Sequence, residues 1–180
     1  RACRNATRII AVSQRTKEDV MELYGIDADK IDVVYQGCDE SFKNPLPSTL
    51  LEKTRRRLQL PEKFILQVGT IERRKNLELT IRSLTAVDDT VSLVAVGKDN
   101  HGYLAEMKKL AESLGVSHRL KWIHDLQFSD MPAVCQLAEV IAYPSRYEGF
   151  GIPVIEGLES MRPVVAATGS CLEEAGGEAA

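Results

Sequence analysis

Five short apolar segments alternate with helical patterns from residue 63 onward. They span residues 64–68, 91–96, 120–123, 139–143 and 163–167. Most of their residues are apolar in succession rather than alternating with polar ones, which is typical of strands buried on both faces. The pattern predicts an α/β fold in which a parallel sheet has helices on both faces. Ligands of such sheets bind beside the carboxyl ends of the strands, so a site is expected in the loops that follow these segments.

Amphipathic helical spacing fills the gaps between the five segments. It predicts helices at residues 76–84, 103–114, 129–137 and 153–160. Ser129 is expected to cap the third of these helices. The first part of the chain has a similar pattern, with strands at 6–13 and 30–35, a helix at 16–24 and a basic connector helix at 48–60. Ser13 and Gly25 are the expected start and stop signals of the helix at 16–24.

Composition excludes several classes of function. The chain has 180 residues, 44% hydrophobic and 27% charged, as in an ordinary globular protein. Its net charge of −3 creates no basic field, so a nucleic-acid partner is not expected. The four cysteines are scattered without CxxC pairs, which argues against a metal site and a disulfide framework and suits a reducing cytoplasm. No apolar run approaches the length of a membrane span.

The strand-turn-helix at residues 143–156 gathers an unusual set of groups. Gly149 and Gly151 let the backbone bend and let a ligand approach closely. The N–H groups at the following helix start have no intrahelical partners, which suits an anionic or oxygen-rich ligand. Glu148 and Glu156 flank the turn, and carboxylates accept paired hydrogen bonds from sugar or ribose hydroxyls. Either acid alone is explained as a solvated or dipole-complementing charge, but two acids, two glycines and an exposed aromatic side chain in one strand-turn-helix indicate a site.

The turn after the first apolar segment is the second candidate. Arg73, Arg74 and Lys75 stand where a helix is predicted to begin, although the partial positive charge of a helix N-terminus disfavours cations. A phosphate or diphosphate bound between the cations and the helix N–H groups would relieve this conflict. Solvation, or pairing with Glu72 and Glu78, is the alternative explanation. Neither a P-loop nor a GxGxxG pattern is present, so ATPase and NAD chemistry are disfavoured.

Together the two turns resemble the motifs of a known family. Residues 68–76 (VGTIERRKN) and 144–156 (PSRYEGFGIPVIE) are similar to those of glycosyltransferase family 4, the group 1 glycosyltransferases. Residues 162–167 and 170–176 resemble the tail of the same family, so the resemblance covers essentially the whole chain. The Glu-x7-Glu turn is a specific motif, and the Arg-Lys-Asn turn is moderately specific. The family implies a GT-B fold, in which two Rossmann-like domains face a cleft and bind the acceptor and the nucleotide-sugar donor.

The resemblance divides the chain into three parts. Residues 1–44 would be the end of the acceptor domain and the interdomain link. Residues 45–61 would be a connector helix, and residues 62–180 a Rossmann-like nucleotide-sugar-binding domain, truncated at its C-terminus. The chain is therefore expected to be the donor-binding fragment of a GT-B enzyme. By itself this fragment is expected to bind the donor but not to catalyse transfer.

The resemblance also implies roles for single residues. Lys75, helped by Arg74, would contact the donor diphosphate, and Glu148 would bind sugar hydroxyls near the reacting carbon; these three would be the catalytic residues. Glu156 would hold the ribose hydroxyls. The base would lie in the loop after residues 120–123, and the remaining donor contacts are expected at Gly69, Thr70, Arg73, Gly149, Phe150, Gly151, Ile123 and His124.

The chain departs from the family pattern in two places. Many members have Arg directly after the first glycine, where this chain has Thr70, so Arg73 or Arg74 must supply a second diphosphate cation. His124 replaces a usual glycine, and a surface or capping histidine is the simpler explanation for it. Tyr143 and Tyr147 are expected to be packing residues rather than ligand contacts.

The implied function is transfer of a hexose, with retention of configuration and without a metal or other cofactor. The donor would be GDP- or UDP-linked, and the first turn resembles that of mannosyltransferases, which favours GDP-mannose. A glycan or lipid-linked acceptor would bind through the N-terminal domain, and membrane contact would arise only in the full-length protein. A nucleotide-sugar epimerase on the same fold and a binding module without turnover are the alternatives, whereas a pyridoxal-phosphate phosphorylase would need a much longer chain.

Overall fold

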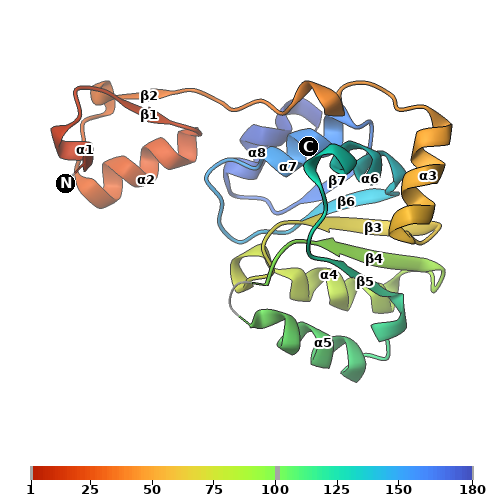
Figure 1. Cartoon of the computed structure of the whole chain (residues 1–180). Helices are drawn as coiled ribbons and strands as arrows, with labels where there is room; N and C mark the ends of the chain where they lie inside the picture. Colours follow the sequence, from red (N-terminus) through yellow and green to blue (C-terminus); the bar gives the residue numbers. More distant parts are fainter. Residues whose placement is uncertain (1, 100–101, 180) are drawn as a thin grey trace.

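A five-stranded parallel sheet organises most of the chain (Figure 1). The computed structural model describes residues 2–99 and 102–179. The strands are β3 (Lys63–Val68), β4 (Val91–Val96), β5 (Leu120–Ile123), β6 (Val140–Tyr143) and β7 (Val164–Ala166). Their order is β5-β4-β3-β6-β7, and all neighbours pair in parallel. The predicted fold is confirmed, because this order is that of the first five strands of a Rossmann-like sheet.

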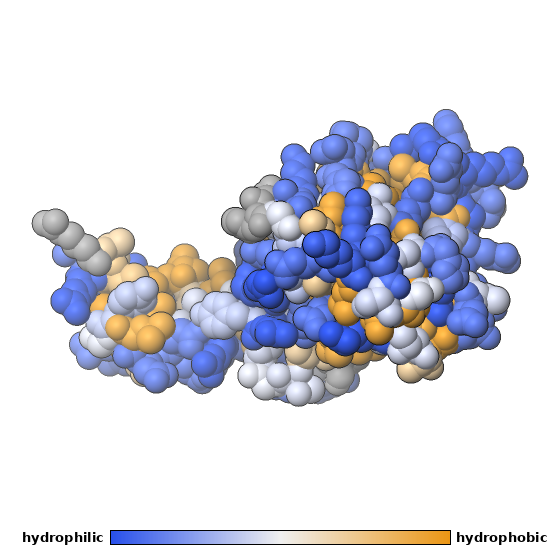
Figure 2. All heavy atoms as spheres, turned by 90° about the horizontal axis from the view of Figure 1, so that it is seen from below, coloured by the Kyte–Doolittle hydropathy of each residue, from blue (hydrophilic) through white to orange (hydrophobic). Residues whose placement is uncertain are grey.

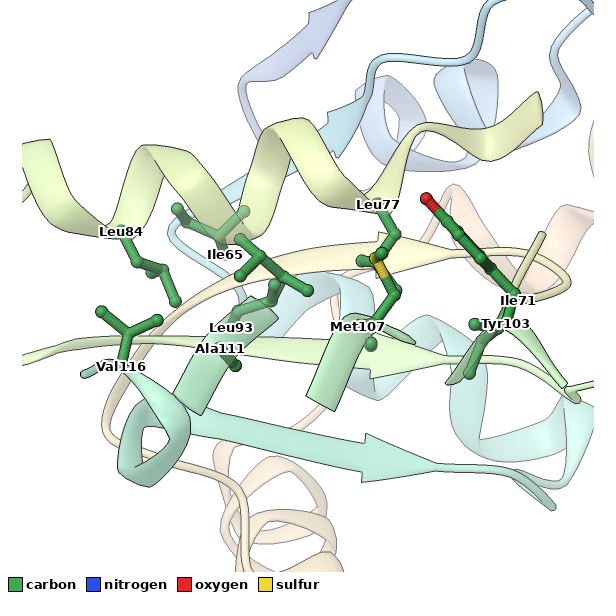
Figure 3. Close-up of a cluster of buried hydrophobic side chains, with 11 residues drawn as sticks. Ile65, Ile71, Leu77, Leu84, Leu93, Tyr103, Met107, Ala111 and Val116 are labelled. Carbon is green, nitrogen blue, oxygen red and sulfur yellow. The ribbon is translucent and has the colours of Figure 1, made fainter. Parts of the chain in front are cut away.

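Helices cover both faces of the sheet. α4 (Leu77–Ser83) and α5 (Tyr103–Ser113) lie on one face, and α3 (Ser48–Leu58) and α6 (Met131–Leu137) lie on the other (Figure 1). Alternate residues of each strand point to opposite faces, so two apolar cores form. The core beneath α4 and α5 includes Ile65, Leu77, Leu93, Met107 and Ala111 (Figure 3). The opposite core includes Phe42, Phe64, Leu66, Val94, Val134 and Ile141.

Two further helices complete this part of the chain. α7 (Ile152–Glu159) follows the β6 turn, and α8 (Cys171–Gly176) follows β7. Val154 of α7 and Leu172 of α8 pack with Tyr143 in a third buried cluster. Short 3₁₀ helices link the elements at Ala28–Lys30, Glu40–Phe42, Arg73–Lys75, Leu84–Ala86, Ser117–Arg119, Phe128–Asp130 and Gly177–Ala179. Within the described part of the chain, no helix is both long and apolar enough to cross a membrane.

The first residues form a smaller lobe beside the main sheet (Figure 1). It contains α1 (Ala2–Asn5), β1 (Ile9–Ala11), α2 (Gln14–Tyr24) and β2 (Ile31–Val33), and its two strands pair in parallel. The predicted helix signals are confirmed, since the Ser13 side chain caps α2 and Gly25 ends it with a φ of 62°. Apolar side chains remain on the surface of this lobe, as Figure 2 shows, and Ile10, Leu23 and Tyr24 are among them.

The predicted cap of α6 is wrong. Ser129 lies inside the 3₁₀ turn Phe128–Asp130, which leads directly into α6 at Met131. Asp130 therefore already has a helical backbone, and its side chain makes no capping hydrogen bond. An N-cap needs an extended residue at the helix boundary, and this continuous entry leaves no room for one. The first two strands are also shorter than the predicted 6–13 and 30–35.

Candidate functional site

The two predicted turns meet at the point where the strand order reverses. The turn after β3 and the turn after β6 leave the carboxyl ends of adjacent parallel strands, where open α/β sheets bind ligands. Hydrogen bonds join the two turns. The Arg146 N–H donates to the Arg74 carbonyl at 2.9 Å, and the Asn76 side-chain amide donates to the Pro144 carbonyl at 3.2 Å. A single rigid site thus forms from residues that are about seventy positions apart in sequence.

One carboxylate and two cations form the centre of the site. Lys75 Nζ lies 2.7 Å from Glu148 Oε1, and Arg74 Nη1 lies 2.8 Å from Glu148 Oε2. The side chains of Lys75 and Glu148 are only 13% and 11% exposed. Burial raises the pKa of Glu148, but the hydrogen bond from Lys75 and the charges of Lys75 and Arg74 outweigh it and hold that pKa below its ordinary 4.5. Glu148 is therefore ionised at neutral pH.

Lys75 is positioned by its backbone and by its stem. The buried Gln67 side chain donates to the Lys75 carbonyl at 2.8 Å. The Lys75 stem passes over Gly69, where an added Cβ would lie 3.1 Å from Lys75 Cε. Gly69 also has a φ of 135°, which side chains rarely adopt. Glycine at this position therefore provides both the turn and the passage for the lysine.

Tyr143 packs as expected, in the cluster with Val154 and Leu172, and its hydroxyl also reaches the charged centre. Its ring is 2% exposed, but its hydroxyl lies 2.6 Å from Lys75 Nζ and 3.2 Å from Glu148 Oε1. Burial raises the pKa of the phenol, so the neutral hydroxyl accepts from Lys75 and donates to Glu148. Tyr147 is instead exposed, and its hydroxyl donates to Asp19 at 2.8 Å. The sequence signal for this contact was the position of Tyr143 at the carboxyl end of a central strand, where such sheets bind ligands.

The three cations lie directly before α4, as the sequence predicts, and ion pairs with carboxylates compensate their charge. Arg73–Lys75 form a separate 3₁₀ helix, and the left-handed residue Asn76 precedes α4, which begins at Leu77. The cations thus lie outside the first turn of α4, and each has a carboxylate partner. Arg74 pairs with Glu72 at 2.7 Å, as the alternative explanation anticipated.

Arg73 faces away from Glu148. It pairs with Glu106 at 2.7 Å and lies 5.0 Å from the centre of the Tyr103 ring. The sequence left open whether Arg73 or Arg74 supplies a second cation for the diphosphate. In the structure Arg74, and not Arg73, lies with Lys75 at Glu148.

The backbone of the β6 turn is held through three successive carbonyl groups. The Tyr147 carbonyl accepts from Arg74 at 2.8 Å, the Glu148 carbonyl from the buried Cys171 thiol at 3.2 Å, and the Gly149 carbonyl from the Ser13 hydroxyl at 2.7 Å. No partner within the described residues accepts from the N–H groups of residues 147–151. These free donors lie directly before α7, so they suit a ligand that is rich in oxygen.

The exposed aromatic side chain expected in this turn is that of Tyr147, whereas Phe150 is buried. Its side chain is 4% exposed and stacks on Tyr35, with ring centroids 5.5 Å apart. Tyr35 belongs to the connection between the two lobes, which the local sequence around Phe150 does not reveal. Gly151 follows with a φ of 123°, and an added Cβ there would lie 2.6 Å from Leu172.

Glu156 lies apart from the charged centre, in the second turn of α7. Burial and the charge of Asp39 raise its pKa, and no described residue donates a hydrogen bond to its carboxylate. A half-buried acid without a donor is costly to the fold. Its carboxylate is therefore accessible to donors from outside the described residues.

The remaining predicted residues line the neighbouring loops. His124 is exposed, and its Nδ1 lies 3.0 Å from the Gly97 carbonyl, in the loop after β5. Ile123 ends β5 and accepts from the Gly97 N–H at 2.9 Å, while Thr70 is half-buried next to Gly69. Residues 2–99 and 102–179 contain no group of three or more His, Cys, Asp or Glu side chains arranged to hold a metal ion.

Comparison with known proteins places this site in a family. The family profile described as "Glycosyl transferases group 1" matches residues 51–177, and that described as "Glycosyltransferase Family 4" matches residues 1–42. The chain is 32% identical over 166 residues to a D-inositol 3-phosphate glycosyltransferase of Xylanimonas cellulosilytica, covering 88% of the chain and 40% of that protein. It is 26% identical over 158 residues to the O-antigen chain mannosyltransferase RfbU of Salmonella typhimurium, covering 87% of the chain and 41% of that protein.

A solved structure supports the same assignment. The crystal structure of Anabaena Alr3699/HepE in complex with UDP and glucose matches 96% of this chain with a TM-score of 0.85 and 25% identity. This chain covers 47% of that structure, so it spans less than half the length of these relatives. The group 1 profile covers more than half of the chain, including both turns of the site. The chain therefore belongs to the group 1 glycosyl transferases.

Proposed function

We propose that this chain is the donor-binding part of a retaining glycosyltransferase that uses a nucleotide-activated hexose. The group of Lys75, Arg74 and Glu148 at the strand-order reversal carries this proposal. Lysine and arginine are the side chains that proteins use to bind phosphate. An ionised glutamate accepts hydrogen bonds from sugar hydroxyls. The related Anabaena structure, which contains UDP and glucose, supports a donor of this chemical class.

The geometry suggests how the donor would be used. The diphosphate would lie between Lys75, Arg74 and the free N–H groups of residues 147–151. Negative charge grows on the diphosphate as the bond between the sugar and its phosphate oxygen breaks. Fixed cations and N–H groups stabilise that charge without having to reorganise. Glu148 would bind the sugar, and Tyr143 would hold Glu148 and Lys75 at a constant separation.

Glu156 would bind the ribose hydroxyls, because its half-buried carboxylate has no donor within the described residues. The loop at Ile123 and His124 would contact the base. The mannosyltransferase among the relatives favours mannose as the donor sugar. The resemblance of the first turn to that of mannosyltransferases favours GDP as its carrier. A glycan or lipid-linked acceptor would bind to the rest of the whole protein.

All four cysteines are unpaired, which supports action in a reducing cytoplasm.

We expect Glu156→Gln to stabilise the empty chain and weaken nucleotide binding. Because the folded-state pKa of Glu156 is raised, ionising this acid above its ordinary 4.5 costs folding free energy, and the cost persists at neutral pH. The neutral amide removes that cost, so Tm at pH 7 should rise and the difference should vanish below pH 4. Calorimetric titration should show weaker binding of ribonucleotides. A lower Tm at pH 7 would contradict the account.

The proposed function is tested by calorimetric titration with UDP, GDP and ADP, each with and without EDTA. We expect one nucleoside diphosphate to bind with a preference that EDTA does not alter. Its sugar-linked form should serve as donor for the longer protein, with the anomeric configuration retained in the product. No binding by a folded chain would overturn donor binding. Binding without transfer by the longer protein would instead support a binding module.

A further inference from the structure

Two hydroxyl groups of the smaller lobe contact the β6 turn. Ser13 Oγ donates to the Gly149 carbonyl at 2.7 Å, and Thr16 Oγ1 donates to the same oxygen at 3.0 Å. A carbonyl oxygen has two lone pairs, so it accepts both bonds at once. Ser13 is fully buried, and its Oγ also caps the Thr16 N–H at 3.0 Å. The contact therefore joins residues that lie 136 and 133 positions apart in sequence.

This contact determines the direction of one free N–H group. The described chain has no cis peptide bond, so the carbonyl of Gly149 and the N–H of Phe150 point in opposite directions. With the carbonyl held against α2, the Phe150 N–H points away from the smaller lobe. Phe150 has no backbone acceptor within the described residues. Its N–H is one of the free donors that precede α7.

A second contact keeps α2 in place. Glu174 of α8 accepts from the Gln14 N–H at 2.6 Å and from the Arg15 N–H at 3.0 Å. These two N–H groups belong to the first two residues of α2 and have no partner within the helix. The carboxylate also complements the partial positive charge of the α2 N-terminus. The hydroxyl pair is thus fixed relative to α8, which in turn holds the Glu148 carbonyl through Cys171.

We propose that Ser13 and Thr16 are positioning residues that orient the Gly149–Phe150 peptide for the donor. The proposal rests on the proposed function, because the oriented N–H serves the bound nucleotide sugar. It assigns a role in the donor site to residues of the smaller lobe, which match a different family profile from the donor turns. Neither residue touches the charged centre, so both act only through the Gly149 carbonyl.

The test compares substitutions that remove the hydroxyl groups with little other change. Thr16→Val keeps the shape of the side chain, and Thr16→Ser keeps the hydroxyl. Ser13→Gly combined with Thr16→Val removes both donors, while glycine remains a tolerated N-cap. Thr85→Val is the matched control, because the exposed Thr85 hydroxyl donates to the Arg82 carbonyl, outside the site. The Phe150 amide resonance and the affinities for UDP-glucose and GDP-mannose are measured on the whole chain.

We expect Thr16→Val to shift the Phe150 amide resonance and to weaken the affinity for the preferred nucleotide sugar about threefold. The double variant should weaken it about tenfold, Thr16→Ser should restore both readouts, and Thr85→Val should leave both unchanged. An unshifted Phe150 resonance with unchanged affinity in a folded double variant would overturn the proposal. If the unsubstituted chain bound neither nucleotide sugar, the proposed donor binding would be contradicted. The Phe150 resonance would still show whether the two hydroxyl groups hold the turn.

Discussion

Gly97→Ala is expected to destabilise the fold by about 3 kcal/mol or more. A Cβ at Gly97 would lie 1.9 Å from the Gly69 carbonyl oxygen, and the φ of Gly97 is 157°. Both the clash and the backbone strain involve main-chain atoms, which have no rotamer to change. Gly69 would have to move, and the Lys75 stem that lies over it would move as well. We therefore expect a loss of nucleotide binding even at temperatures where the variant is still folded.

Urea unfolding measures the effect of Gly97→Ala, and Gly37→Ala is its matched control. Gly37 lies in the connection between the lobes, where an added Cβ meets nothing within 4 Å and φ is not positive. Its substitution should change the free energy of unfolding by less than about 0.5 kcal/mol. If Gly97→Ala were as stable as the control, the close approach of the β3 and β4 loops would be contradicted.

Glu148→Gln should separate nucleotide binding from sugar binding. The amide keeps the size of the side chain but loses the charge that holds Lys75 and Arg74. Lys75 would then have no carboxylate partner and Arg74 would keep only Glu72, so UDP or GDP should bind more tightly than to the unsubstituted chain. The gain in affinity from the attached sugar should disappear, and transfer by the longer protein should fall about 100-fold or more, the scale of losing one preorganised charged contact.

Glu72→Gln is the control for Glu148→Gln, because the Glu72 carboxylate pairs with Arg74 at 2.7 Å, whereas Lys75 contacts only the backbone carbonyl of Glu72, through its own N–H. It removes one negative charge from the same turn while the Lys75–Glu148 pair remains. We expect it to keep the sugar-dependent gain in affinity and most of the transfer rate. Equal behaviour of the two variants would contradict a specific role for Glu148.

The fold was predictable because it depends on local pattern. Solid apolar segments and amphipathic helices alternate from β3 onward, and only a parallel sheet accommodates that order. The meeting of Lys75 and Glu148 was predictable for the same reason, since both residues follow strands of one sheet. The resemblance to a family indicated the chemical roles of Lys75 and Glu148. It did not show which of Arg73 and Arg74 faces Glu148. Their different directions depend on Glu106 and Tyr103, which lie on α5.

The missed features depend on contacts that are distant in sequence. Phe150 is buried because Tyr35 stacks on it, and the Gly149 carbonyl is held because α2 of the smaller lobe lies against it. Neither contact has a local periodic signal. The hydroxyl of Tyr143 was missed because a tyrosine at the end of a buried strand is explained by packing alone. Only the position of Lys75 Nζ, 2.6 Å away, shows its second role.

The most direct test of the central claim is to compare Lys75→Ala with Arg73→Ala by calorimetric titration with the preferred nucleoside diphosphate. The two residues lie in the same 3₁₀ helix, and each substitution removes one positive charge. Only Lys75 faces Glu148, whereas Arg73 pairs with Glu106. We predict that Lys75→Ala weakens affinity about 30-fold or more, and that Arg73→Ala changes it less than about twofold. Equal weakening by both, or no effect of Lys75→Ala, would contradict a diphosphate site at the carboxyl end of β3.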